Sequence, residues 1–276
     1  MKSPIIPTTL VICLLTVATN LFAQAHLAGP PYIPRLQIDP QLDKLLDKIE
    51  LRSNQLKSFQ ADMLFEQLDM EWQTISIRHG KTYYQADEKV VQFLIHFEDW
   101  LQKDIDDDED TSKPSKYDEH LGFDGMWFTH LNAHTKHCLK REISKTPHNR
   151  QAFRLGKGDI PLPFAIQKKD VLKEFDVKLI PLDPKKPVKL KEPTDHLFLK
   201  PKKGSSFAQK YLSLELWISQ KTSLPLQIRY RSDDFETTTV TWSNIQADKK
   251  INPATFELKP PAGWDVEITP LEIKSK

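Results

Sequence analysis

Residues 211–219 have the sequence YLSLELWIS, in which apolar and polar side chains alternate. Leucine or isoleucine occupies every second position from residue 212 to residue 218, and Ser213 and Glu215 lie between them. A period of two is typical of a strand with one buried face, because successive side chains of a strand point to opposite sides. The segment therefore predicts a β-strand whose apolar face packs against a core.

Three further strands are predicted around this segment. Residues 196–199, 226–231 and 237–245 are rich in apolar, aromatic or β-branched side chains, which favour strands. Residues 222–225 (TSLP) supply a hairpin turn. Strands that are joined by short turns, with no helix between them, favour an antiparallel meander over a parallel sheet.

The same period appears in the first half of the chain. Its apolar members are Phe59, Ala61, Met63 and Phe65 in one segment, and Val91, Phe93, Ile95 and Phe97 in another. Shorter strands are expected at residues 73–77, 82–85, 119–128 and 140–144, with turns at residues 79–81 and 124–125. Most of the chain is therefore predicted to be antiparallel sheet.

Two helices are predicted to pack against this sheet. Asp39 is a helix N-cap residue, and Pro40 suits the first helical position. The apolar residues that follow at helical spacing are Leu42, Leu45, Leu46, Ile49 and Leu56. A second helix is expected at residues 162–174, entered at Pro161 or Pro163. Its apolar residues are Phe164, Ile166, Val171, Leu172 and Phe175.

Residues 1–25 are predicted to be a signal peptide. Lys2 precedes an apolar stretch at residues 10–17, and residues 23–25 (AQA) have the pattern that signal peptidase cleaves. A membrane anchor is the alternative, although a spanning helix needs about 20 continuous apolar residues. We therefore expect an exported, periplasmic protein with a proline-rich arm at residues 26–38 and a single domain at residues 39–276. Cys138 would be its only cysteine.

Composition and motifs argue against several functional classes. Lys and Arg number 39 against 38 Asp and Glu, a net charge of +1, whereas nucleic-acid-binding proteins normally carry a basic surplus. Glycine occurs only 8 times in 276 residues, and the sequence has no Walker, G-x-S-x-G or H-E-x-x-H motif. We therefore expect no nucleic-acid partner, no cofactor and no enzymatic activity.

Two segments contain residue types that bind metal ions in other proteins. Imidazoles and thiolates are zinc ligands, and His130, His134, His137 and Cys138 lie close together in sequence, although an exposed hairpin tip is the favoured interpretation. Residues 104–116 (DIDDDEDTSKPSK) are acidic, but they lack the glycine and the final acid of a calcium-binding EF-hand loop. The prediction is therefore a solvated acidic loop, with metal binding by the histidine and cysteine cluster kept as the less favoured alternative.

The order of these elements resembles the LolA-like family of periplasmic lipoprotein carriers over residues 42–267. The shared order is an exported chain, an amphipathic helix, a long antiparallel meander, a mid-chain helix and closing strands. The segments that carry the resemblance are FQAD at residues 59–62, FDGMW at 123–127, LSLELWI at 212–218, SLP at 223–225, TTTVTWSN at 237–244 and FELKPPAGW at 256–264.

The resemblance implies an α+β fold, namely a strongly curved antiparallel sheet (an incomplete β-barrel) with helices that lid its concave apolar face. It also implies a non-enzymatic binder or carrier whose partner is an acyl-chain lipid or a lipoprotein. The insertions at residues 104–116 and 183–193 keep an alternative open, in which the same fold is a periplasmic sensor or scaffold that binds a membrane-protein segment.

The candidate ligand-binding residues are the apolar ones that alternation places on the concave face, together with two on the lid. Alternation does not distinguish a packed core from the wall of a cavity, so both interpretations remain open. The residues are Ala61, Met63, Phe65, Phe93, Ile95, Phe97, Leu212, Leu214, Leu216, Ile218, Leu226 and Ile228 and, on the lid, Phe164 and Leu172.

Overall fold

A computed structural model describes residues 38–87, 90–106, 113–146, 154–155, 162–181, 190–232 and 235–271. All of them belong to the second of the two units into which the chain divides, Met1–Gln37 and Ile38–Lys276. The predicted signal peptide and the predicted arm up to residue 37 lie outside the described residues. So do residues 107–112, which form the middle of the predicted acidic loop.

The first helix forms as its sequence predicts. The cap of α1 (Pro40–Gln55) is Asp39, whose Oδ1 accepts a hydrogen bond from the Gln41 N–H at 2.8 Å. The apolar stripe of α1 and the leucine that follows it are buried in the main core: Leu42, Leu45, Leu46, Ile49 and Leu56. Within the described ranges, no helix is both long and apolar enough to cross a membrane.

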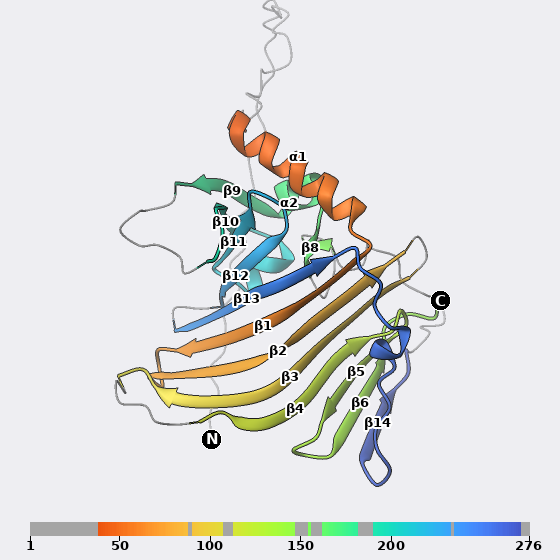
Figure 1. Ribbon diagram of the computed structural model, residues 1–276. Coiled ribbons are helices and arrows are strands. Elements are labelled where there is room, and N and C mark those ends of the chain that lie inside the picture. The colour runs from red at the N-terminus through yellow and green to blue at the C-terminus, as the bar shows by residue number, and fades with distance from the viewer. Residues whose placement is uncertain are drawn as a thin grey trace, which may run out of the picture. The chain divides into compact units, whose positions relative to one another are not determined.

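Twelve strands form one open, curved sheet (Figure 1). Neighbouring strands are antiparallel except for β6 and β14, which are parallel. In spatial order the strands are β14 (Asp265–Thr269), β6 (His137–Glu142), β5 (Trp127–Asn132), β4 (Ser115–Phe123), β3 (Val91–Asp104), β2 (Thr74–Ala86), β1 (Ser58–Asp69), β13 (Glu236–Ala247), β12 (Pro225–Arg231), β11 (Ser213–Ser219), β10 (Thr194–Pro201) and β9 (Phe175–Ile180). The predicted curved antiparallel sheet is confirmed, and the parallel strand β14 is an addition to it.

The two faces of the sheet are covered by different segments. Alternate residues of β1, including Phe59 and Met63, point into the main core, and this side of the sheet is named the inner face. Gln60 and Asp62 point to the opposite side, named the outer face. On the outer face of β3, Leu94 packs in a small apolar cluster with residues of the C-terminal segment, including Phe256 of η3 (Pro253–Phe256).

The predicted turn at residues 79–81 is wrong, because these residues lie within β2, which is continuous from Thr74 to Ala86. The pairing of β2 with β3 shifts between Ile77 and Gly80, which is a bulge. A Cβ atom on Gly80 would lie 2.0 Å from the carbonyl oxygen of His96. Glycine is therefore required here for a close approach of two strands and not for a turn.

The predicted helix at residues 162–174 is wrong in its first half. β8 (Leu162–Ile166) pairs with β7 (Arg154–Leu155) and precedes α2 (Lys168–Glu174). Phe164, Ala165 and Ile166 are all buried, and a short, fully buried apolar run has no period that separates strand from helix. The Ile166 N–H donates a hydrogen bond to the Ser53 hydroxyl at 3.2 Å, which attaches β8 to α1.

Candidate functional site

An aromatic cluster centred on Phe164 of β8 fills one part of the inner face. The centroid of its ring lies 4.9 Å from that of Phe59, 4.8 Å from that of Tyr84 and 6.4 Å from that of Trp242. All four side chains are buried. Aromatic rings at these separations attract one another beyond the burial of their area. This region is therefore packed core.

The Trp242 ring is also held by a buried polar contact. Its Nε1–H donates a hydrogen bond to the Thr82 hydroxyl at 3.1 Å, and that hydroxyl donates to the Met63 sulfur at 3.3 Å. Because both polar groups are buried, each would cost free energy without its partner. The two bonds therefore favour one orientation of the indole, which matters because Trp242 also forms the wall of a cleft.

A cleft of about 500 Å³ lies where β12 begins and β13 ends. Its apolar wall consists of Leu190, Leu224, Leu226, Trp242, Ile245 and Ala247. Clefts of roughly 300–1,000 Å³ with mainly apolar walls are typical of small-molecule sites. Its volume lies in this range, and its apolar wall makes the cleft the candidate ligand-binding site of the described residues.

Charged side chains line the same cleft. Arg52 from the end of α1, Lys191 and Lys221 are cationic, and Glu192 is anionic. Lys191 and Lys221 are exposed to solvent, so their ammonium groups remain hydrated. An apolar wall with a mainly cationic rim matches a ligand that has an apolar body and an anionic head.

The end of α1 is attached to the strand that forms the cleft wall. An Nη atom of Arg52 lies 2.8 Å from Oδ2 of Asp248, directly after β13, and the Lys57 N–H donates to Oδ1 of the same carboxylate at 2.9 Å. Burial acts to raise the pKa of Asp248, but the hydrogen bonds from Lys57 and Arg52 outweigh it and hold that pKa below its ordinary value. The ionised carboxylate therefore helps to fix Arg52 at the cleft.

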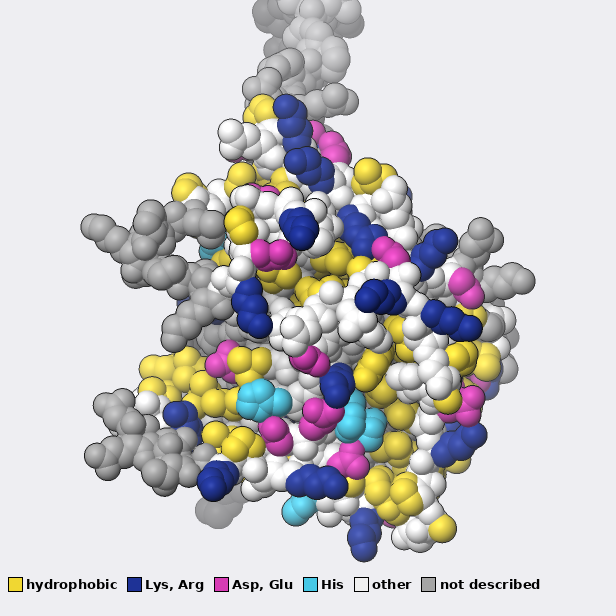
Figure 2. Space-filling view, viewed as in Figure 1, with side chains coloured by type: hydrophobic (Ala, Val, Ile, Leu, Met, Phe, Trp, Pro, Cys, Tyr) yellow, Lys and Arg dark blue, Asp and Glu magenta, His cyan; other side chains and the backbone are white. Residues whose placement is uncertain are grey.

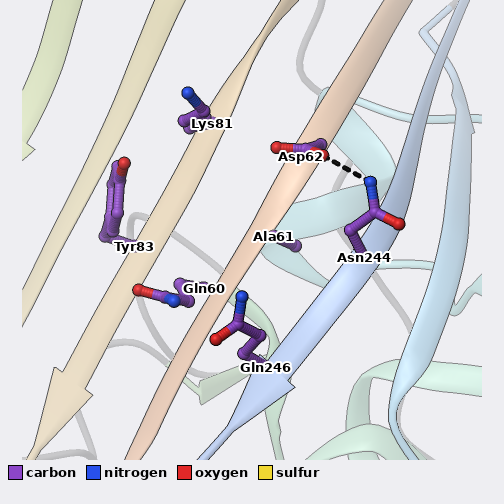
Figure 3. Close-up of a pocket in the computed structure, with 7 residues that line it drawn as sticks. All are labelled: Gln60, Ala61, Asp62, Lys81, Tyr83, Asn244 and Gln246. Carbon is purple, nitrogen blue, oxygen red and sulfur yellow. Dashed lines mark hydrogen bonds between the residues drawn. The ribbon is translucent and has the colours of Figure 1, made fainter. Parts of the chain in front are cut away.

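A smaller polar recess of about 170 Å³ adjoins the cleft at Asn244 (Figure 3). Asn244 has a φ of +52° and lies where the register of β13 against β1 shifts. Its Nδ2–H donates to Oδ2 of Asp62 at 2.6 Å. The side chains of Gln60, Lys81 and Gln246 also line the recess. Its volume is below the range that is typical of ligand sites.

Farther along the inner face, Arg78 of β2 lies among aromatic rings and one buried carboxylate. Its guanidinium carbon is 5.6 Å from the ring centroid of Phe65 and 5.2 Å from that of Phe97. Its Nη1 lies 3.2 Å from Oε2 of Glu119, while Nε2 of His130 lies 2.6 Å from Oε1 of the same carboxylate. Glu119 is only 6% exposed, so its charge is balanced within the fold.

The structure does not bring the predicted histidine and cysteine cluster together. In the pairing of β5 with β6, His130 lies opposite Leu139 and Cys138 lies opposite Leu131, so His130 and Cys138 point to opposite faces. Cys138 is fully buried, and that burial raises the pKa of its thiol. His134 is exposed in the turn between the strands, in agreement with the favoured interpretation as a hairpin tip.

Most of the candidate ligand-binding residues belong to the main core. The buried ones are Ala61, Met63, Phe93, Phe97, Phe164, Leu214, Leu216, Ile218 and Ile228, and those packed against them with partial exposure are Phe65, Ile95 and Leu172. Leu226 alone among the predicted residues lines the cleft. Leu212 precedes β11 and is 47% exposed, so its expected place on a covered face is wrong. In the alternating segment, the residues buried in the main core are Leu214, Leu216 and Ile218.

The apolar periodicity of the sequence does not identify the remaining cleft residues. A cleft forms where segments that are distant in sequence come together, and periodicity carries no information about this. Leu224 belongs to the predicted hairpin turn, and Trp242 belongs to a predicted strand. Arg52 comes from a helix that is distant in sequence. The sequence therefore contains Trp242 and Leu224 as apolar residues of a strand and a turn, but it does not predict that they lie next to each other.

The outer face of β11 is also less exposed than alternation predicts. Trp217 is only 2% exposed, because the ring of His196 stacks on it at 4.3 Å and the guanidinium of Arg229 lies 5.0 Å from its centroid. Nε2 of His196 lies 2.7 Å from Oε2 of Glu215. The hydrogen bond from His196, with smaller help from Arg229, outweighs burial and lowers the pKa of Glu215. A polar and aromatic network thus covers this face.

No family model and no curated protein matches the sequence. The solved structures to which the chain is similar include an uncharacterised conserved protein from Thermus thermophilus, with a TM-score of 0.46, 12% identity, and coverage of 83% of this chain and 99% of that one. They also include a LolA superfamily protein from Nitrosomonas europaea, with a TM-score of 0.33, 10% identity, and coverage of 78% and 97%.

The complex of MucA and MucB from Pseudomonas aeruginosa is a further similar structure. Its TM-score is 0.42 at 11% identity, with coverage of 79% of this chain and 61% of that one. Because all three TM-scores lie below 0.5, the function proposed for the present chain rests on its own packing and charges.

Proposed function

We propose that the chain is an exported, non-enzymatic binder or carrier of a ligand with an acyl chain, and that the ligand occupies the cleft beside Trp242. The supporting observation is that the cleft has a volume of about 500 Å³ and is lined on one side by apolar side chains. Burial of an acyl chain gains about 0.8 kcal/mol per methylene, so a chain that partly fills this volume binds without covalent chemistry. The lipid part of a lipoprotein would satisfy the same requirement.

In this proposal α1 and α2 act as a lid. Arg52 of α1 lines the cleft, and Lys168 of α2 is 2.7 Å from carboxylate oxygens of both Asp43 and Asp47 on α1. The two helices are therefore joined to each other by ion pairs at the surface. Such surface pairs are individually weak, and α1 is held in place mainly by its buried apolar stripe.

The test measures binding of a fluorescent fatty acid to the full chain and its displacement by unlabelled palmitate. Thr222 is exposed and lines the cleft, so Thr222→Trp should obstruct the ligand with little effect on folding. We expect its affinity for the probe to fall by at least about tenfold, which corresponds to roughly 1.4 kcal/mol. The matched control is Ala254→Trp, because Ala254 is exposed and does not line the cleft.

Charge reversal tests the cationic rim separately. Lys221→Glu should weaken the binding of a fatty acid more than that of the corresponding uncharged alcohol. Lys203→Glu, at an exposed lysine that does not line the cleft, should change neither. Failure of the wild-type chain to bind any acyl probe, together with the absence of co-purifying lipid in native mass spectra, would exclude the proposal.

The alternative function, a sensor or scaffold that binds a membrane-protein segment, is supported by the edge strand β14. Its residues are all exposed, including Val266 and Ile268, and no described strand pairs with its free edge. Exposed edge strands accept extended peptides by strand addition. Cross-linking from β14 in the periplasm to one dominant protein partner, without bound lipid, would favour this alternative.

A further inference from the structure

Two histidines and an aspartate meet on the outer face of β3 and β4. His96 lies directly opposite His120 in the strand pairing, and Asp118 lies two residues before His120, so all three side chains are on the same face. The imidazole rings stack with their centroids 4.0 Å apart and their planes at 10°. Figure 2 shows histidine side chains among acidic and basic ones on the visible face, where β2, β3 and β4 run in Figure 1.

The carboxylate of Asp118 is close to both rings. Its Oδ1 is 3.0 Å from Nε2 of His96 and 3.6 Å from Nδ1 of His120. One potential ligand atom from each residue lies within 4.8 Å of the others. In a tetrahedral zinc site with bonds of about 2.0–2.1 Å, neighbouring ligand atoms are roughly 3.3–3.4 Å apart. The two separations lie on either side of that value. Because the lone pairs of the imidazole nitrogens lie in the ring planes and the rings are stacked, the rings must turn about their side-chain bonds to direct both nitrogens at one ion.

The surroundings leave this trio available. The three side chains are 24–43% exposed, so an ion can reach them from solvent. The neighbouring cation, Lys81, is 3.1 Å from Glu98 and therefore has its own carboxylate partner.

We propose that His96, Asp118 and His120 form a binding site for a divalent transition-metal ion of the Zn²⁺ type. Two imidazoles and one carboxylate are the ligand set of many three-ligand zinc sites, in which the fourth position holds water or another ligand. The ion would join β3 to β4 on the face opposite the main core. The site is independent of the acyl-ligand proposal, because none of its residues lines the cleft.

The experiment titrates Zn²⁺ into the chelator-treated full chain and follows heat release and the midpoint of thermal unfolding. The wild-type chain should bind one ion and unfold at a higher temperature when the ion is present. His120→Gln retains a planar polar side chain but removes the imidazole, and His96→Ala removes the opposite ring. Each should weaken Zn²⁺ binding at least about tenfold and remove the thermal shift. Asp118→Asn should weaken binding to a similar degree.

His79 provides the matched control, since its Nδ1 lies 2.8 Å from Oδ1 of Asp99 in the same sheet, without a second imidazole. His79→Ala should leave Zn²⁺ affinity unchanged within about twofold. The proposal is overturned if the folded wild-type chain binds no Zn²⁺ tighter than about 1 mM. It is also overturned if the His96 and His120 variants, folded by circular dichroism, bind as tightly as the wild-type chain. The trio would then be only a hydrogen-bonded surface cluster.

Discussion

Two apolar regions share Trp242, and they differ in what fills them. Around Phe164, a segment from β8 inserts an aromatic ring between Phe59, Tyr84 and Trp242. Around Leu226, the described residues leave a cleft of about 500 Å³. Both walls are built from strands with similar apolar patterns. The difference shows that alternation determines which way a side chain points, whereas a distant segment determines whether the space beside it is filled.

The largest effect is expected when the filled region is emptied. Phe164→Ala removes a ring that is 3% exposed and contacts three other aromatic rings. The free energy of unfolding should fall by about 3–5 kcal/mol, which is usual for large-to-small changes at packed aromatic positions. Urea denaturation measures this change. A loss below about 1 kcal/mol would show that Phe164 is not packed, and the contrast with the cleft would disappear.

A smaller effect is expected at the wall of the cleft. Leu226→Ala should reduce the free energy of unfolding by about 2 kcal/mol, the lower end for Leu→Ala, because the side chain already borders open space. The same change should weaken binding of an acyl probe. Urea denaturation and probe titration are measured on the same preparation. A stability loss as large as that of Phe164→Ala, with unchanged probe affinity, would indicate that the cleft is closed core in solution.

The sequence predicts local structure well where a capping residue or a regular apolar pattern determines it. Asp39 followed by Pro40 predicts the start of α1, and the alternation at residues 212–218 predicts β11, which begins at Ser213. The sequence predicts secondary structure less well where tertiary contacts determine the conformation of a segment. Gly80 is typical of a turn, but in the structure it permits a close approach of β2 and β3. Phe164 fits the apolar pattern of a helix, but it lies in the strand β8.

The candidate sites depend on strand register and on contacts between segments that are distant in sequence. Neither can be derived from the spacing of residues along the chain. Residues close in sequence, His130 and Cys138, point to opposite faces, whereas His96 and His120 become direct neighbours across two strands. Likewise, only Leu226 of the predicted ligand residues reaches the cleft, because most of the others are covered within the main core.

The attachment of α1 beside the cleft should contribute a modest, pH-dependent stability. The pKa of Asp248 is lower in the folded than in the unfolded chain. Its contribution to the free energy of unfolding is therefore complete above the pKa that Asp248 has in the unfolded chain, and it is lost as the pH falls through the lower pKa of the folded state. Asp248→Asn should therefore cost about 0.5–1 kcal/mol at neutral pH, since the pair with Arg52 is partly exposed. Denaturation at pH 7 and in acid measures the difference.

The difference between wild type and Asp248→Asn should disappear in acid, below the folded pKa of the aspartate. A difference that is equally large in acid would attribute the stabilisation to the shape of the side chain and not to its charge. Glu257→Gln is the control, because Glu257 is exposed and its ion pair with Lys259 is local, at 3.0 Å. It should change stability little at either pH.

The smallest effect is expected at the leucine that begins the alternating segment. Leu212 has the same pattern position as Leu214, but it is 47% exposed whereas Leu214 is 1% exposed. Leu212→Ser should therefore change the free energy of unfolding by less than about 0.5 kcal/mol and leave acyl-probe affinity unchanged. Leu214→Ser should be strongly destabilising, because it places a hydroxyl in the core. If Leu212→Ser instead abolishes probe binding without unfolding the chain, the ligand lies at the start of β11 and not in the cleft beside Trp242.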